Sequence, residues 1–266
     1  MIEKTATDKA EIKARRAQHN KQVYNSRFGF LNETQGVRPA SFIGLMGTAG
    51  SGKSTLVKSI VSDCAVNESV LCYLTEEKSE DYEMHLHFIG AKMENISFIE
   101  ENETSFNGLD VDAGIALLLE PLFMSDAKLI FFDNITTSIL YEKFGYKGQC
   151  KLISALRAFC NDSGKTVFFV AHCKKGSDNN GHRLFTGDDI RGTYQAFQQA
   201  EYFYILQPVN VKDRIFPLLQ IAKHRFHDEI TSKFYLMGYY DRQYKSDMAI
   251  GFEKIKEIFK KRNVLK

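Results

Sequence analysis

The stretch GTAGSGKST at positions 47–55 constrains this chain more than any other feature of its sequence. It follows the apolar run SFIGLM and precedes LVKSIV, an order that predicts a strand, a glycine-rich loop and a helix. Gly47, Gly50 and Gly52 let the loop fold tightly, so that its N–H groups and the positive helix N-terminus face an anion. The stretch therefore predicts a P-loop that binds the phosphates of a nucleotide.

Two residues of this loop have specific expected roles. Lys53 is expected to neutralise phosphate charge, and the hydroxyl of Ser54 is expected to bind Mg²⁺. Because both positions are filled, we predict ATP and Mg²⁺ as cofactors rather than a glycine-rich turn that binds nothing. The residues expected to contact the nucleotide are Gly47, Thr48, Ala49, Gly50, Ser51, Gly52, Lys53, Ser54 and Thr55.

Length and composition favour one folded core in a reducing compartment. A chain of 266 residues with 44% hydrophobic content can bury one good-sized core but not a second large domain. The five cysteines are scattered and lack C-x-x-C spacing, which argues against a disulfide framework or a zinc site. The sequence has no apolar stretch of membrane-spanning length and no signal-peptide core. We expect a cytoplasmic protein without a membrane partner.

Short apolar runs alternate with amphipathic stretches from residue 41 onward. This alternation predicts an α/β fold, a mostly parallel twisted sheet with helices on both faces. The expected parallel strands are 41–47, 69–74, 95–100, 128–133, 165–172 and 201–206, and the expected helices between them are 53–65, 114–124 and 150–162. Extra C-terminal strands are expected at 215–225 and 232–240, before a basic helix at 251–262.

The N-terminal region differs in composition from the rest. Residues 1–35 are rich in charged residues and predict a helix followed by a linker, or alternatively a solvated tail. Residues 36–266 form the predicted nucleotide-binding domain. The formal net charge is only +2, so any contact with nucleic acid must come from a local basic patch.

Acidic side chains end two of the expected strands. Asp133 closes the apolar run KLIFFD at the carboxyl edge of the sheet, where ligands bind. Alone it would more often be a helix cap, but beside a P-loop we predict that it orders Mg²⁺. Glu76 and Glu77 follow the strand VLCYL, and one of them is predicted to polarise the water that attacks the γ-phosphate. We favour Glu76, with Glu77 as the alternative; both could instead simply begin the next helix.

His172 ends a third apolar strand, TVFFVAH. Its side chain could hydrogen-bond the γ-phosphate and report the loss of that phosphate to the loop that follows. The alternative is an ordinary polar residue with its hydrogen bonds satisfied. The prediction of a catalytic role depends on the neighbouring motifs.

These motifs occur in the order found in RecA-fold ATPases. Over residues 36–240 the chain most closely resembles the DnaB-type and plasmid RepA-type hexameric helicase cores. Within GDDIRGTYQAFQQAEYFYIL, Arg191 and Gly192 match best, and Glu201 stands where DnaB-like chains usually carry Asp. The resemblance implies a RecA-like ATPase domain and a homo-oligomer in the form of a hexameric ring.

The stretch KHR at 223–225 resembles the Lys-x-Arg motif of that family. The resemblance implies that Lys223 and Arg225 reach the nucleotide bound by the neighbouring subunit and stabilise charge on it. The alternative is that KHR begins an edge strand and keeps its cations in water. His172 occupies a position where many relatives carry Gln and where RepA-like chains also use His.

In the RecA fold, the two loops after the strands ending at Asp133 and His172 face a central channel. Here they span 135–149 and 173–189. Basic side chains that follow phosphates, an aromatic Tyr146 and flexible backbone suit single-stranded DNA, although two solvated loops would look similar. The cations predicted to contact DNA are Lys143, Lys147, Lys174, Lys175 and Arg183, with His182 beside them.

Three functions are compatible with these motifs. The preferred one is a ring-forming motor on single-stranded DNA, a replicative helicase of phage, plasmid or mobile-element type that could work with other replication proteins. The second is a nucleotide-gated assembly switch of the same fold that regulates a partner. The third, a recombination filament, predicts open helical assemblies instead of closed rings.

Overall fold

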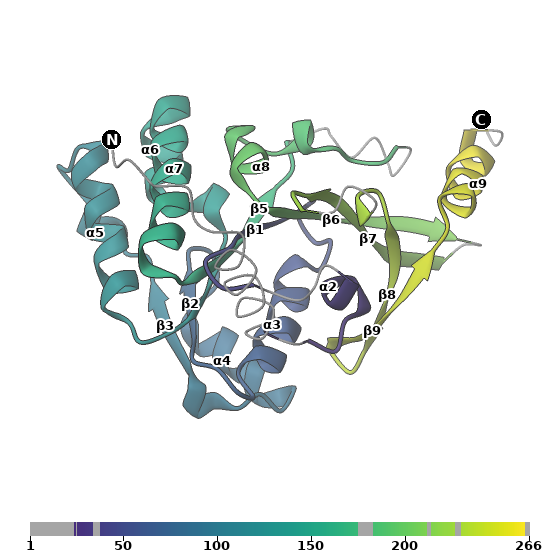
Figure 1. Ribbon diagram of the computed structural model, residues 1–266, viewed down its shortest axis with the longest axis horizontal. Coiled ribbons are helices and arrows are strands. Elements are labelled where there is room, and N and C mark those ends of the chain that lie inside the picture. Colours follow the sequence, from purple (N-terminus) through teal and green to yellow (C-terminus); the bar gives the residue numbers. More distant parts are fainter. Residues whose placement is uncertain are drawn as a thin grey trace, which may run out of the picture.

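The centre of the molecule is a nine-stranded sheet in the order β3-β2-β4-β5-β1-β6-β7-β8-β9 (Figure 1). It is seen in a computed structural model that describes Tyr24 and residues 26–33, 38–174, 183–211, 214–226 and 230–263. The strands from β3 to β6 in this order are parallel, and β7, β8 and β9 continue the sheet antiparallel. The predicted fold class, a mostly parallel sheet with extra C-terminal strands, is confirmed.

The central parallel strands are buried, whereas the edge strand β3 is partly exposed. β1, β2 and β4 are buried along their whole length, because helices cover both faces of this half of the sheet. The strands are β1 Phe42–Gly47, β2 Val70–Leu74, β3 Ile96–Glu100, β4 Leu129–Asp133, β5 Thr166–His172, β6 Tyr202–Val211, β7 Arg214–His224, β8 Phe234–Tyr240 and β9 Gln243–Ile250.

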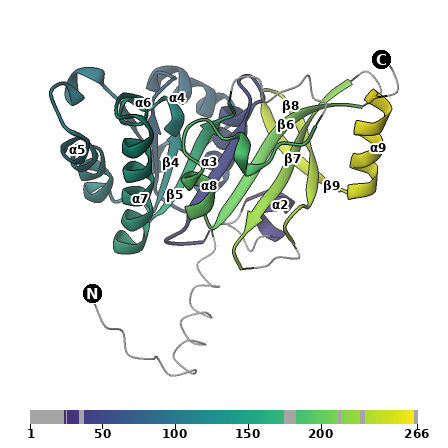
Figure 2. The same ribbon diagram turned by 90° about the horizontal axis from the view of Figure 1, so that it is seen from above.

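Two layers of helices cover the sheet (Figures 1 and 2). Side chains alternate along each strand, so Phe131 packs with α3 and α4 on one face while Phe132 packs with α5 and α7 on the other. The helices are α2 Gly29–Glu33, α3 Lys53–Cys64, α4 Ser79–Phe88, α5 Val111–Met124, α6 Ile139–Lys143, α7 Gly145–Ser163, α8 Gln195–Gln199 and α9 Phe252–Asn263. No helix in the described ranges is both long enough and apolar enough to cross a membrane.

Part of the expected N-terminal linker belongs to the core. Phe28 and Phe30 are fully buried, and the N–H groups of Gly29 and Phe30 each donate to the Asp247 carboxylate of β9 at 2.7 Å. A domain boundary at residue 35 therefore does not coincide with the edge of the packed core. The sequence did not reveal this because the partner residue is more than 200 positions away. The charged helix expected before Tyr24 lies outside the described residues.

The expected loop at 135–149 is wrong, because this segment is largely helical. It contains the 3₁₀ turn Ile135–Thr137, all of α6 and the start of α7. The carboxylate of Glu101, at the end of β3, accepts hydrogen bonds from the Ser138 hydroxyl at 2.8 Å and the Ile139 N–H at 2.7 Å. Glu101 thus caps α6 from a distant strand, so local composition could not show that a helix begins here.

Candidate nucleotide site

The P-loop links the end of β1 to the start of α3. Gly50 and Gly52 have φ values of 72° and 88°, in the left-handed region that glycine enters without strain. A side chain at Gly47 would collide with the carbonyl oxygen of Leu206 on β6. The loop therefore requires glycine at these positions because its backbone turns sharply and lies against a neighbouring strand.

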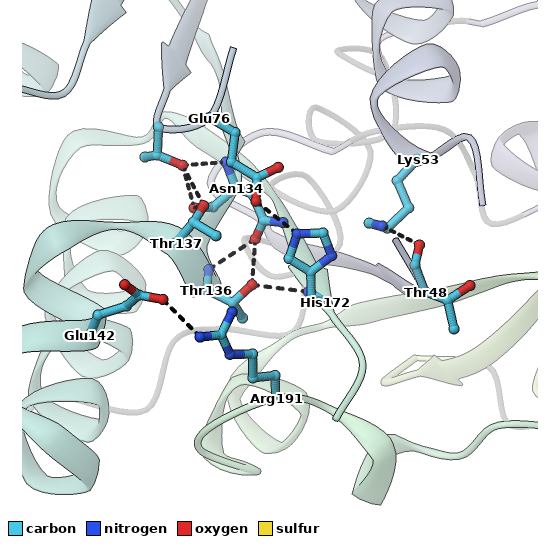
Figure 3. Close-up of polar contacts among 10 residues, drawn as sticks. Thr48, Lys53, Glu76, Asn134, Thr136, Thr137, Glu142, His172 and Arg191 are labelled. Atoms are coloured by element: carbon cyan, nitrogen blue, oxygen red, sulfur yellow. Dashed lines mark hydrogen bonds and ion pairs between the residues drawn. The ribbon is translucent and has the colours of Figure 1, made fainter. Parts of the chain in front are cut away.

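The polar groups of this loop fit a polyphosphate. The Lys53 ammonium is buried and donates to the Thr48 carbonyl at 2.7 Å (Figure 3). Burial lowers the pKa of Lys53, and the charges of Asp133 and Glu76 partly oppose that shift. The Ser51 hydroxyl is buried without a hydrogen-bond partner among the described residues. A phosphate would supply the missing acceptors to both groups and to the N-terminus of α3.

Ser54 and Asp133 meet where α3 begins and β4 ends. The Ser54 hydroxyl hydrogen-bonds the Asp133 carboxylate, and burial raises the pKa of Asp133 to about 6. A nearby cation would favour the ionised form of this carboxylate. The described residues contain no cluster of three His, Cys, Asp or Glu side chains that could hold a metal by themselves. The pair therefore fits Mg²⁺, which takes the rest of its octahedral shell from phosphate oxygens and water.

Glu76 and Glu77 lie in different environments. The Glu76 carboxylate accepts a hydrogen bond from Nε2 of His172 at 2.8 Å (Figure 3). This bond, with a further one from Thr137 and the charge of Lys53, holds the pKa of Glu76 below its usual value. Glu77 instead accepts from the buried Lys58 ammonium at 2.6 and 2.8 Å. Of the two carboxylates, only Glu76 is hydrogen-bonded to another residue expected in the site, His172, which favours Glu76 as the base.

His172 is held by a polar network around the end of β4. Its main-chain N–H donates to the Thr136 hydroxyl at 3.0 Å, and Thr136 donates to the Asn134 amide oxygen (Figure 3). The Nδ1 atom of His172 is buried and has no partner within the described residues. Because an ionised Glu76 carboxylate can only accept, Nε2 carries the proton of this hydrogen bond, and Nδ1 is available to a further group.

Sequence reasoning missed the threonine and asparagine members of this network. Thr75 donates to the Asn134 carbonyl at 2.8 Å and also hydrogen-bonds Thr137. The run NITT directly after Asp133 was a usable signal, because Asn and Thr at strand ends often bond local backbone groups. These residues connect the ends of β2, β4 and β5.

Lys223 and Arg225 lie at the opposite end of the sheet from the P-loop. The Arg225 N–H donates to the Glu201 carbonyl, and the Glu201 N–H donates to the carbonyl of Phe42, the first residue of β1. β1 is about 16 Å long, from five steps of ~3.3 Å, and the P-loop follows its other end. This placement argues against contact with the P-loop of the same chain, so action on a neighbour's nucleotide stays a prediction.

The ammonium of Lys223 is bound to the end of a short helix. It donates to the carbonyls of Phe197 and Gln198 in α8, at 2.8 and 2.6 Å. Burial, helped by the charge of Arg225, lowers the pKa of Lys223 to about 8. The Arg225 guanidinium is exposed and makes one long contact of 3.4 Å with the Gln198 carbonyl. Both cations are therefore positioned by main-chain carbonyls.

Arg191, Gly192 and Glu201, which carried part of the family resemblance, have structural partners. The Arg191 guanidinium pairs with Glu142 at 2.8 Å, and its N–H donates to the His172 carbonyl at 2.8 Å (Figure 3). Gly192 has a φ of 88° and lies against the Tyr141 hydroxyl. Glu201 is buried in an ion pair with Arg157. Arg191 thus connects α6 to the strand that carries His172.

Most of the cations expected to contact DNA are bonded within the chain. Lys143 donates to the Phe106 carbonyl at 3.0 Å, and Lys174 donates to the Asp188 carbonyl at 2.7 Å. Arg183 forms a two-pronged ion pair with the buried Asp189 carboxylate. Lys147 is exposed on α7, and Lys175 and His182 lie outside the described residues. DNA contact stays a prediction, and it is weakest for Arg183, whose partner is buried.

No protein-family model and no curated protein sequence matches this chain. Among solved structures, the chain is similar to the KaiC-like protein PH0186 from the hyperthermophilic archaeon Pyrococcus horikoshii OT3. The TM-score is 0.66 at 16% identity, and the match covers 86% of this chain and 99% of the other. The fold is RecA-like. At this identity the likeness shows the fold alone, and the closer resemblance to DnaB-type and RepA-type cores stays a prediction.

Proposed function

We propose that this protein is a Mg²⁺-dependent ATPase whose active site is completed by a neighbouring copy, and that it acts on single-stranded DNA as a helicase motor. One observation carries the proposal. The acidic residues and the P-loop lie at one end of β1, whereas Lys223 and Arg225 lie at the other. A head-to-tail ring brings the two ends of successive subunits together, and a hexamer is the expected closed form.

The residues of one subunit have distinct parts in this proposal. Bound Mg²⁺–ATP would supply the phosphoryl group that is transferred to water, with ADP as the leaving group. Lys53 neutralises phosphate charge, and Ser54 and Asp133 hold the metal. Glu76 takes the proton of the attacking water onto its carboxylate, while His172 orients Glu76 through their 2.8 Å hydrogen bond. The partner's Lys223 and Arg225 then stabilise charge that develops on the γ-phosphate.

Single-stranded DNA is the proposed substrate of the motor. Lys147 and Tyr146 are exposed on the first turn of α7, and they offer a cation for phosphate and a ring for stacking. Lys143, Lys174, Lys175 and Arg183 are the further proposed contacts. This part of the proposal also implies a cytoplasmic replication protein of phage, plasmid or mobile-element type, working with other replication proteins.

The second candidate is a nucleotide-gated assembly switch. It is favoured by the internal carbonyl and carboxylate partners of Lys143, Lys174 and Arg183, which leave fewer free cations for DNA. A KaiC-like protein shares the fold, so a role other than unwinding is compatible with this architecture.

Steady-state ATP hydrolysis with and without single-stranded DNA separates the candidates. We expect the motor to be stimulated roughly tenfold or more by DNA, with the stimulation falling as salt rises. Slow turnover that ignores DNA would favour the switch. Electron microscopy of the nucleotide-bound protein tests the assembly, because open helical filaments would favour a recombinase-like function.

A further inference from the structure

A buried lysine of α3 faces the second carboxylate of the Glu76–Glu77 doublet. The Lys58 side chain is only 6% exposed, and its ammonium donates to both oxygens of Glu77 at 2.6 and 2.8 Å. The ammonium also lies 4.3 Å from the centre of the Tyr82 ring of α4, which is fully buried. A lysine is almost never buried to this extent unless it is paired. The Glu77 carboxylate is thus what makes a buried cation possible at this position.

Lys58 lies one helical turn beyond Ser54, on the same face of α3. Residues four apart on a helix are neighbours, with about 5–6 Å between their Cβ atoms. Ser54 hydrogen-bonds Asp133 and Lys58 binds Glu77, so the two carboxylates are neighbours along α3. The charge of Glu77 is felt at Asp133, because it adds to the burial and the Glu76 charge that raise the pKa of Asp133. Glu77 is therefore close to the proposed metal site, although its oxygens are bound to Lys58.

We propose that Lys58 is a positioning residue that holds Glu77 away from the metal, so that Ser54 and Asp133 remain the only protein ligands of Mg²⁺. This inference rests on the proposed function. Mg²⁺ prefers oxygen ligands and is usually bound by one or two carboxylates together with phosphates. A free Glu77 side chain, about one turn of α3 from Asp133, would compete with the phosphates for the metal. Because Lys58 binds both of its oxygens, Glu77 has neither to offer.

A third free carboxylate would change what the site binds. The described residues contain no group of three His, Cys, Asp or Glu side chains that could hold a metal by themselves. If Glu77 were released, its carboxylate and that of Glu76 would both face Asp133, on which their charges already act. Such a cluster would hold Mg²⁺ without ATP and draw it from the position set by the phosphates. Lys58 thus makes metal binding depend on the nucleotide.

The two partners of the ion pair are buried to different degrees, which separates this role from a purely structural one. The Glu77 side chain is 35% exposed, so water can reach it when Lys58 is removed. Neutralising Glu77 would instead leave Lys58 as a buried, unpaired charge. Glu77→Gln should therefore destabilise the fold more than Lys58→Met does. Hydrolysis should show the opposite order, since only Lys58→Met releases a carboxylate toward the metal.

The test is a double-mutant cycle in the full chain, with Lys58→Met, Glu77→Gln and the double variant. Single-turnover ATP hydrolysis without DNA is measured for each, and so is denaturant unfolding with and without Mg²⁺ alone. We expect Lys58→Met to hydrolyse ATP roughly 10- to 100-fold more slowly, as for a small misplacement of reacting groups. Without nucleotide, Mg²⁺ should stabilise Lys58→Met more than the wild type. In the double variant most of the rate should return and the extra stabilisation by Mg²⁺ should disappear.

A matched control is available on the surface. Lys151 donates to both oxygens of Asp112 at 2.8 and 2.7 Å, and both side chains are exposed. Lys151→Met should change neither the rate of hydrolysis nor the response to Mg²⁺. If Lys58→Met does not fold, Lys58→Gln gives the same comparison, because it keeps a hydrogen-bond donor but loses the charge that holds Glu77.

Three outcomes would overturn the inference. The first is a rate in Glu77→Gln that is as low as in Lys58→Met or lower, because hydrolysis would then follow stability. The second is a Lys58→Met protein whose unfolding responds to Mg²⁺ no more than that of the wild type. The third is a double variant as slow as Lys58→Met. Failure of the proposed function looks different: the wild type would not hydrolyse ATP, while the unfolding and Mg²⁺ measurements would still report on Lys58.

Discussion

The two ends of β1 differ in how their charges are compensated. At the carboxyl end, Glu76 and Asp133 face the Lys53 ammonium and hydrogen-bond His172 and Ser54, so each carboxylate has partners within the same chain. At the amino end, Lys223 and Arg225 contact main-chain carbonyls, and neither makes an ion pair within the described part of the chain. Lys223 is half-buried, and the opposing charge that acts on it is that of Glu201, which is already paired with Arg157. A half-buried cation with so little counter-charge is unfavourable in an isolated chain. The comparison teaches that the amino end is suited to an anion from outside, such as a neighbour's nucleotide.

The largest expected effect tests whether the two ends belong to different active sites. Lys53→Ala should abolish hydrolysis, and Arg225→Ala should reduce it roughly 10³- to 10⁵-fold, as for loss of an arginine finger. A mixture of the two variants should regain activity. In random assemblies about a quarter of the interfaces pair an intact P-loop with an intact finger.

The control for this experiment is the assembly state of the mixture. Sedimentation must show that mixed oligomers form, and each variant alone must stay inactive. If Arg225 acted on its own subunit, the mixture would remain as inactive as its components. If Arg225→Ala kept full activity, the cation would have no catalytic part.

The next effect concerns only the residues at the carboxyl end of β1. Glu76→Gln should cut turnover roughly a hundredfold or more while ATP still binds, because it removes the base but keeps the shape of the side chain. Glu77→Gln is the matched neighbour, and it should cost much less because Glu77 pairs with Lys58. Single-turnover hydrolysis and nucleotide binding measure the two quantities. A crippled Glu77→Gln with an active Glu76→Gln would reverse the assignment.

A smaller effect is expected when the cations proposed to contact single-stranded DNA are replaced. Lys174→Ala and Lys147→Ala should weaken single-stranded DNA binding with little change in basal hydrolysis. Each lost phosphate contact should reduce the log–log salt slope by about 0.7. Arg183→Ala should mainly loosen its loop, because it leaves the buried Asp189 carboxylate unpaired. Unchanged salt slopes for all three variants would remove these residues from the DNA path.

The smallest effect is a pH dependence of stability that arises from Lys223, at the amino end of β1. Burial lowers the pKa of Lys223 to about 8, below its usual value near 10.5. Between these values the unfolded chain binds a proton that the folded chain does not, so stability should rise with pH across this window. Lys223→Met should flatten that rise, measured by denaturant unfolding at several pH values. A wild-type profile that falls over the same window would contradict the assignment.

Features that depend on neighbouring residues in the chain were predictable. The P-loop, the apolar strand before it and the acidic end of β4 are local patterns, and the alternation of strands and helices follows from burial on both sheet faces. The strand β9 was not predicted, and α4 entered only as the helix that Glu76 and Glu77 could begin, because neither sequence has a regular spacing of apolar residues. The four residues FGFL at 28–31 form too short an apolar run to show that they pack in the core.

The sequence by itself determined the glycine-rich strand–loop–helix turn and the carboxylates that follow the strands beside it. Tertiary structure decided that Glu76 bonds to His172 while Glu77 bonds to Lys58, because consecutive side chains leave the chain in different directions and packing selects their partners. It also decided that Lys223 and Arg225 lie at the far end of β1 and that a pocket opens beside the P-loop. Each of these depends on tertiary packing, which brings together residues that are distant in the chain and leaves no local trace in the sequence.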